Sequence, residues 1–242
     1  MYWLSPLDIA AMAWLGVCWS AYAWMCDRSP RGEQGLMKVV HPYRERWLRE
    51  CVVRDNRMVD AALVGNLMRS VSFFASTSIL ILGGLLTALG YTERGMEITA
   101  ELPLAKHTSA ALWETKVLLL IAIFFYAFFK LSWSLRQYNV LSVMIGAAPA
   151  PGAAQAEQEA FVRSGTGISS FAGDEFLRGM RAYYFGMAAV TWFIQPWLFI
   201  AVTTLVVAIL YWREFRSSVL RSIRDTAPDR SPDSPGVSPP RA

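Results

Sequence analysis

The chain is poor in the residues from which metal sites and most catalytic sites are built. Its 242 residues include only two histidines, His41 and His107, and three cysteines, Cys18, Cys26 and Cys51. The spacing of the cysteines matches neither a zinc pattern nor an even-numbered disulfide framework. We therefore expect no metal site and no cofactor, and thiols that serve as small apolar side chains.

Charge is also scarce, and long apolar runs take its place. Only 17% of the residues are charged, whereas 54% are hydrophobic; soluble proteins are about a quarter charged. Several apolar runs approach the ~20 residues that a helix needs to cross about 30 Å of hydrocarbon. The composition predicts an all-α, polytopic integral membrane protein. The net charge of +4 comes from basic segments beside the apolar runs, which favours anionic lipid as a partner and not nucleic acid.

Five apolar segments are long enough to cross a membrane. They cover about 6–25, 67–91, 112–133, 176–194 and 196–212. Ser5, Pro6 and Asp8 have the spacing of an N-cap, a first helical residue and a capping box. Because no basic residue precedes the first run, we expect an uncleaved anchor and not a signal peptide. Lys116 and Lys130, near the ends of the third segment, are expected to reach the membrane interface.

The last apolar region allows two interpretations. Residues 181–212 would form a helix of about 48 Å, which is long for one crossing. Gln195-Pro196 divides this region, and Trp192 and Trp197 flank the division. Since tryptophan favours the headgroup level, we favour a helical hairpin and five crossings; the alternative is four crossings with a kinked last helix.

The distribution of arginine and lysine predicts the orientation of the chain. Residues 26–69, 135–181 and the tail from Arg213 are rich in basic residues, whereas 91–111 holds only Arg94 and Lys106. The positive-inside rule then places the C-terminus in the cytoplasm and the N-terminus in the periplasm. We therefore expect a multi-pass protein of the bacterial inner membrane.

Three further stretches complete the predicted organisation. An amphipathic cytoplasmic helix is expected over about 42–66, where Trp47, Leu48, Cys51, Val52, Val59, Ala62, Leu63 and Asn66 recur near helical spacing. "GAAPAPGAAQAE" at 146–157 is typical of a flexible linker. Residues 1–225 form the transmembrane helical domain in this interpretation, and 226–242 form a disordered Pro/Ser/Asp/Arg tail.

Several strings together resemble one family of bacterial membrane proteins. They are "RDNRMVDAALVGNLMRSVSFFASTSILILGG", "QYNVLSVMIGAAP", "GDEFLRGMRAYYFGMAAVTWF" and "YWREFRS". They are similar to domain-of-unknown-function family number 599. The resemblance covers nearly the whole chain except its C-terminal tail. It implies a multi-helix membrane protein, and it brings no activity and no catalytic residue.

Two groups of residues are candidates for function. Small and hydroxyl side chains recur along the second segment and are candidates for helix packing or for lining a pore: Ser72, Ser76, Thr77, Gly83 and Gly84. Polar side chains near the cytoplasmic helix ends are candidates for binding an anion or a lipid headgroup: Lys130, Arg136, Arg178, Arg181, Tyr183 and Tyr184. The alternative for the second group is an interfacial network of ion pairs.

No nucleophile with a base and no ionisable group at mid-membrane is expected, which disfavours an enzyme and an ion-coupled pump. Two hypotheses remain. The first is an accessory or scaffold protein that self-associates as a homo-oligomer and binds lipid or another membrane protein. The second is a passive channel or carrier for a small solute, with an anion as one candidate.

Overall fold

The computed structural model describes residues 5–29, 35–100 and 109–216, and in these ranges it contains helices and no strand. The predicted tail at 226–242 lies outside the described residues. The helices, in chain order, are α1 (Pro6–Asp27), α2 (Leu36–Val53), α3 (Met58–Gly90), α4 (Thr92–Ala100), α5 (Ala110–Gly146), α6 (Gln155–Val190), the 3-10 turn η2 (Thr191–Phe193) and α7 (Pro196–Phe215).

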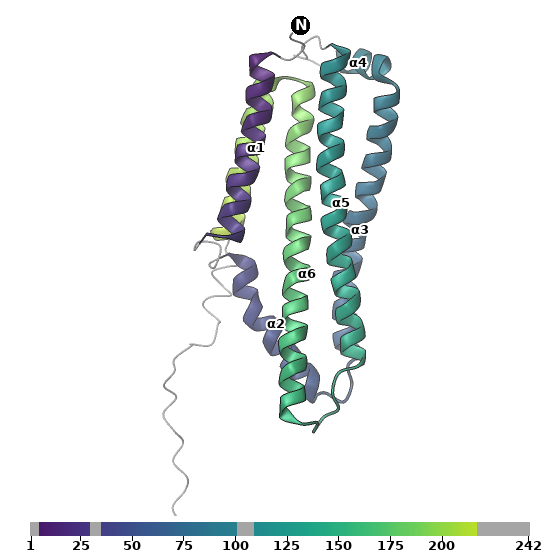
Figure 1. The fold of residues 1–242 in the computed structure, drawn as a ribbon, viewed down its shortest axis with the longest axis vertical. Coiled ribbons are helices and arrows are strands. Elements are labelled where there is room, and N and C mark those ends of the chain that lie inside the picture. Colours follow the sequence, from purple (N-terminus) through teal and green to yellow (C-terminus); the bar gives the residue numbers. More distant parts are fainter. Residues whose placement is uncertain (1–4, 30–34, 101–108, 217–242) are drawn as a thin grey trace, which may run out of the picture.

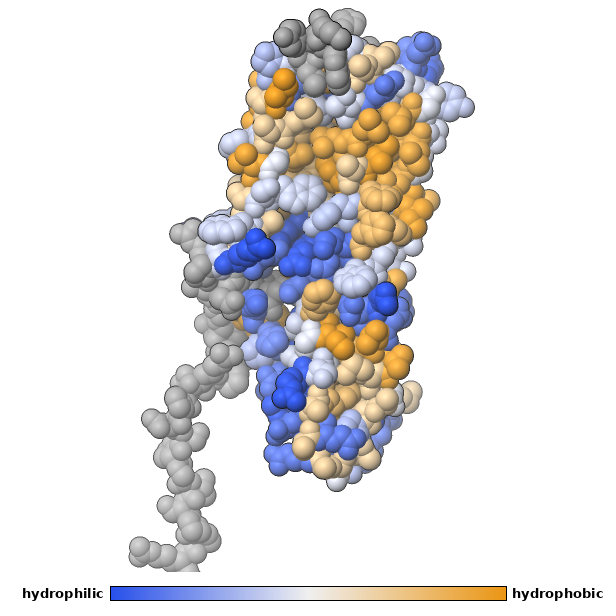
Figure 2. All heavy atoms as spheres, viewed as in Figure 1, coloured by the Kyte–Doolittle hydropathy of each residue, from blue (hydrophilic) through white to orange (hydrophobic). Residues whose placement is uncertain are grey.

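The bundle has two halves along its length (Figure 1). The upper half holds α1, α7 and the adjoining parts of α3, α5 and α6. The lower half holds α2 and the other ends of α3, α5 and α6. A broad hydrophobic band covers the visible face of the upper half, and hydrophilic residues gather below it (Figure 2).

Four of the described helices are long and apolar enough to cross a membrane: α1, α3, α5 and α7. The last part of α6 runs beside them in the upper half (Figure 1). The chain then turns back at η2, and α7 begins at Pro196. Gln195-Pro196 therefore separates two helices, as the hairpin interpretation predicts, because proline fits the first position of a new helix.

The predicted start of the first helix is confirmed. The Asp8 backbone N–H donates to Ser5 Oγ at 3.3 Å, and the Ser5 N–H donates to the Asp8 carboxylate at 3.2 Å. This reciprocal pair satisfies two backbone donors that the first turn of a helix would otherwise leave open.

The connection predicted at 146–157 is present but shorter, because α5 continues to Gly146 and α6 already begins at Gln155. Arg57 fixes the short connection by donating to the carbonyl oxygens of Ala148 and Pro149. Glycine allows close packing in the lower half, where a Cβ on Gly165 would lie 3.0 Å from a methyl group of Leu48. The helical turns at 134–146 and 155–175 lie outside the predicted apolar segments, because polar and charged side chains interrupt the apolar runs there.

The predicted amphipathic helix is correct in its first part and wrong in its second. Leu48, Cys51 and Val52 are buried on α2, which packs against α6. Val59 and Leu63 are exposed. The helix is interrupted at residues 54–57, where Arg54 is extended with ψ 134°. This interruption resets the helical phase, so the periodicity of α2 does not continue into α3.

Lys116, which is expected at the membrane interface, is buried within the bundle and only 4% exposed. Its ammonium group lies 5.5 Å from the ring centre of Trp192 and 5.7 Å from that of Phe193. The negative faces of these rings offer a buried cation an electrostatic partner.

Candidate functional site

Ionic side chains from three helices meet where the upper half joins the lower half. We call them the interfacial cluster: Asp27 of α1, Lys130 of α5, and Glu175, Arg178 and Arg181 of α6. Arg178 donates to Glu175 at 2.5 Å and to Asp27 at 3.1 Å. Lys130 lies 2.8 Å from the second oxygen of Glu175, and Arg181 lies 3.3 Å from Asp27. The cluster joins α1 and α5 to the same two turns of α6.

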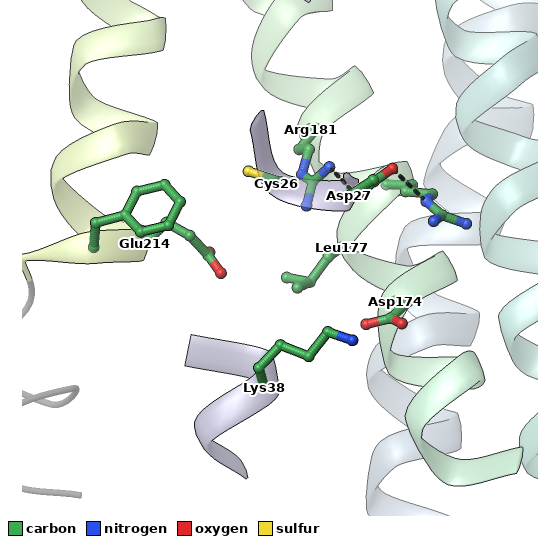
Figure 3. A pocket seen from close by; sticks show the side chains of 9 residues that line it. Cys26, Asp27, Lys38, Asp174, Leu177, Arg181 and Glu214 are labelled. Carbon is green, nitrogen blue, oxygen red and sulfur yellow. Dashed lines mark hydrogen bonds and ion pairs between the residues drawn. The ribbon is translucent and has the colours of Figure 1, made fainter. Parts of the chain in front are cut away.

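A cavity of about 80 Å³ adjoins this cluster, between the ends of α1 and α7, the start of α2 and the middle of α6. Figure 3 shows Lys38 and Asp174 facing each other across it, with the Glu214 carboxylate directed toward the same space. The cavity is lined by Cys26, Asp27, Lys38, Asp174, Leu177, Arg178, Arg181, Glu214 and Phe215. Its three cationic and three carboxylate side chains balance, so its lining has no excess of positive charge for an anion.

Among the carboxyl groups that line this cavity, Asp174 is the one whose pKa is shifted by burial. Burial raises the pKa of Asp174, although the neighbouring cations Arg178, Arg44 and Lys38 act to lower it. Burial also lowers the pKa of the Arg44 guanidinium. Desolvation therefore outweighs ion pairing at Asp174, and the ionised carboxylate is less favourable here than in water.

The structure brings together only three of the six predicted anion-site residues. Lys130, Arg178 and Arg181 belong to the interfacial cluster, where each forms an ion pair with a carboxylate. Arg136 is exposed and stacks on Trp133 at 5.3 Å. This geometry is that of an ion-pair network, the alternative that the sequence left open.

The two predicted tyrosines face other helices. The Tyr183 hydroxyl lies 2.8 Å from Ser78 Oγ and donates to the Phe74 carbonyl oxygen at 2.5 Å. The Tyr184 hydroxyl accepts from Arg213 at 3.0 Å. Ser78, which sequence reasoning did not select, is therefore the fully buried hydroxyl that joins α3 to α6.

The five predicted packing residues of α3 do not form a packed contact inside one chain. Gly83 and Gly84 have no atom within 4 Å of the position of an added Cβ. Ser76 is exposed, and Ser72 and Thr77 are half-buried. The Thr77 hydroxyl donates back to the Phe73 carbonyl oxygen at 2.8 Å. These residues face outward in the upper half.

The outward side of α3 continues into the lower half. At 100° per residue, one stripe carries Val59, Leu63, Asn66, Ser70, Phe73, Thr77 and Gly84, which we call the α3 outer face. Val59 is 70% exposed, Leu63 41% and Phe73 65%. The opposite side of the helix is buried at Val64, Val71 and Ala75 against the rest of the bundle. The α3 outer face is therefore open along both halves.

One polar pair in the lower half was also missed. Ser170 Oγ lies 2.8 Å from His41 Nδ1, and the two residues are 129 positions apart. No local motif could have indicated this contact.

Most of the chain matches one known protein family. The family described as "Protein of unknown function, DUF599" matches residues 10–219. The chain belongs to this family. The DUF599 match runs from α1 to the end of α7 and includes the interfacial cluster and the α3 outer face. No curated protein and no solved structure matches the chain.

Proposed function

We propose that this DUF599 protein is a five-crossing scaffold of the bacterial inner membrane that self-associates through the α3 outer face. The fifth crossing is the last part of α6, paired with α7 in a hairpin. The proposal rests on two points. The first is the position of the bilayer along the bundle, and the second is the part of α3 that lies outside the bilayer and is not covered by lipid.

Polar contacts near the two ends of α1 suggest where the two membrane boundaries lie. At one end Trp192 donates to Asp8, and Lys116 lies over the Trp192 ring. At the other end Asp27 binds Arg178 and Arg181. At ~1.5 Å per residue, the stretch of α1 from Asp8 to Asp27 is about 28 Å long. This length fits a hydrocarbon core of about 30 Å. The basic lower half then lies in the cytoplasm.

The observation that carries the proposal is the exposure of Val59 and Leu63 below this boundary. Outward-facing apolar residues in the upper half need no protein partner, because lipid covers them. Lipid does not cover the lower half, where Val59 is 70% exposed and Leu63 41%. Exposed apolar side chains that continue along one helix face beyond the bilayer favour a protein partner.

A second copy of the chain is the partner that this face fits best. Gly84 and Thr77 are small enough to let two α3 helices approach closely within the bilayer. Val59 and Leu63 would extend the same contact into the cytoplasm. A two-fold axis would bring each α3 outer face against its equivalent, which is the commonest symmetry of homo-oligomers.

Analytical ultracentrifugation in detergent tests this assembly. The wild-type chain is expected to sediment as an oligomer, and Gly84→Leu is expected to weaken assembly because a bulky side chain separates the helices. Gly16→Leu is the matched control, since Gly16 lies on α1 and is equally open. A monomeric wild type, or equal loss of assembly in both variants, would contradict the proposal.

A passive channel for a small solute is the alternative that the sequence raised. It requires the α3 hydroxyls to line a path, whereas within one chain they face outward or bond to their own helix. Flux of labelled anions through reconstituted vesicles distinguishes the two functions. The scaffold proposal predicts no flux above that of empty vesicles.

A further inference from the structure

An apolar groove runs between α1 and α7 in the upper half. It has a volume of about 600 Å³ and is lined by Trp14, Val17, Cys18, Ala21, Tyr22, Met25, Thr204, Val207, Ala208, Tyr211, Trp212 and Arg216. This volume lies within the roughly 300–1,000 Å³ of known ligand sites. Both helices run in the same direction from the upper end (Figure 1), so the groove lies along the bilayer normal.

The middle of the groove is suited to a hydrocarbon chain. Trp14 Nε1 donates to Thr204 Oγ1 at 3.0 Å, and the same hydroxyl donates to the Ile200 carbonyl oxygen at 2.9 Å. The hydroxyl of Thr204 is therefore already satisfied and does not require a polar ligand. Ala21 and Ala208 contribute small side chains to the two walls, which leaves the groove open.

The charge of the groove is confined to its cytoplasmic end. Arg216, which caps α7, is its charged lining residue. In the part of the chain that the structure describes, nothing bonds to the Arg216 guanidinium. Neighbouring arginines are occupied, Arg213 by the Tyr184 hydroxyl and Arg181 by Asp27. Trp212 and Tyr211 line the same end, where aromatic side chains favour the headgroup level.

We infer that this groove binds one anionic phospholipid of the cytoplasmic leaflet, with an acyl chain between α1 and α7 and the phosphate at Arg216. The order of the groups matches such a lipid, because the apolar walls end at a single guanidinium at headgroup depth. Arginine presents a planar fork that binds phosphate through two hydrogen bonds. The site lies on α1 and α7, so it is independent of self-association through α3.

Native mass spectrometry of the detergent-solubilised chain tests the site with two lipids that have the same dioleoyl chains. Phosphatidylglycerol is expected to bind once per chain and more tightly than phosphatidylcholine. Ala208→Trp and, separately, Val17→Trp should abolish this binding, because either indole fills the groove. Leu118→Trp is the matched control, since Leu118 is exposed on α5 and is not part of the groove.

Charge variants separate the phosphate contact from general attraction to the membrane surface. Arg216→Gln should weaken phosphatidylglycerol binding at least tenfold, because it removes the charge-assisted hydrogen bonds to the phosphate. It should weaken phosphatidylcholine binding less, because the choline ammonium of that lipid already balances the charge of its phosphate. Arg28→Gln is the matched control, because Arg28 is exposed at the end of α1 outside the groove. Equal effects of the two charge variants, or unchanged binding in both groove-filling variants, would overturn the inference whatever the oligomeric state.

Discussion

The Trp192 indole N–H donates to the Asp8 carboxylate at 2.8 Å, across 184 positions of sequence, and so joins the first turn of α1 to the turn between α6 and α7. Both side chains are buried, Trp192 completely and Asp8 to all but 3%. The Trp192 ring also stacks on Phe199, with ring centres 5.6 Å apart. One residue therefore connects three elements at the upper end of the bundle.

We predict that Trp192→Phe lowers the free energy of unfolding by about 1–3 kcal/mol, because it leaves a buried carboxylate without one of its donors. Phenylalanine keeps an aromatic ring for stacking. Trp197→Phe is the control, since Trp197 is 56% exposed on the other side of the turn. Chemical unfolding in detergent measures both variants, and equal stability of the two would show that the indole N–H does not hold the helices together.

The interfacial cluster predicts that Arg178 contributes more to stability than Arg136 does. Arg178→Gln should lower the free energy of unfolding by about 1–3 kcal/mol, because it removes a partner from the buried Glu175 and separates α1 from α6. This loss is smaller than that for breaking a fully buried ion pair, since the Arg178 side chain is 30% exposed. Arg136→Gln should change little, because Arg136 is exposed on Trp133. Similar melting temperatures for the two variants would contradict a structural role of the cluster.

The raised pKa of Asp174 gives a prediction about pH. A carboxyl group with a raised pKa in the folded state binds its proton more strongly when folded than when unfolded. Its stabilising contribution is present below the unfolded pKa and is lost as the pH rises through the folded pKa. Asp174→Asn should therefore not lower the melting temperature at pH 7. It should also reduce the increase in stability that the wild type shows when the pH is lowered and Asp174 binds its proton. Loss of stability at pH 7 would show that ion pairing outweighs burial.

Local chemistry explains which features of the fold could be predicted from the sequence. The start of α1 depends on Ser5 and Asp8, which interact within one turn, so their spacing is sufficient. The hairpin depends on Pro196, which begins α7 as its fixed φ and missing N–H favour. These signals lie within a few residues of the structure that they produce.

The missed features depend on contacts between distant residues or on a change of helical phase. Ser78 and Tyr183 are 105 positions apart, and no pattern in α3 identifies Ser78 as the buried member of a hydroxyl-rich run. The exposure of Val59 follows from the interruption before α3, which periodicity across 42–66 does not detect. Lys116 is buried because Trp192 and Phe193 from another part of the chain cover it.

The five-crossing topology predicts that the C-terminal tail is cytoplasmic. A fluorescent protein fused after Arg224 and produced in a bacterial host should fluoresce, whereas a periplasm-dependent phosphatase at the same place should be inactive. In this topology α6 and α7 would form two crossings and return the chain to the side that carries the basic lower half. An active phosphatase and a dark fluorescent protein would restore four crossings.

Cross-linking in intact membranes tests self-association through the α3 outer face most directly. The chain would carry alanine in place of Cys18, Cys26 and Cys51, and one new cysteine at either Leu63 or Phe171. Both side chains are exposed in the lower half, but Leu63 is on α3 and Phe171 is on α6. With a short bis-maleimide, we predict a covalent dimer from Leu63→Cys and monomer from Phe171→Cys. Monomer from both variants, or equal dimer from both, would contradict self-association through α3.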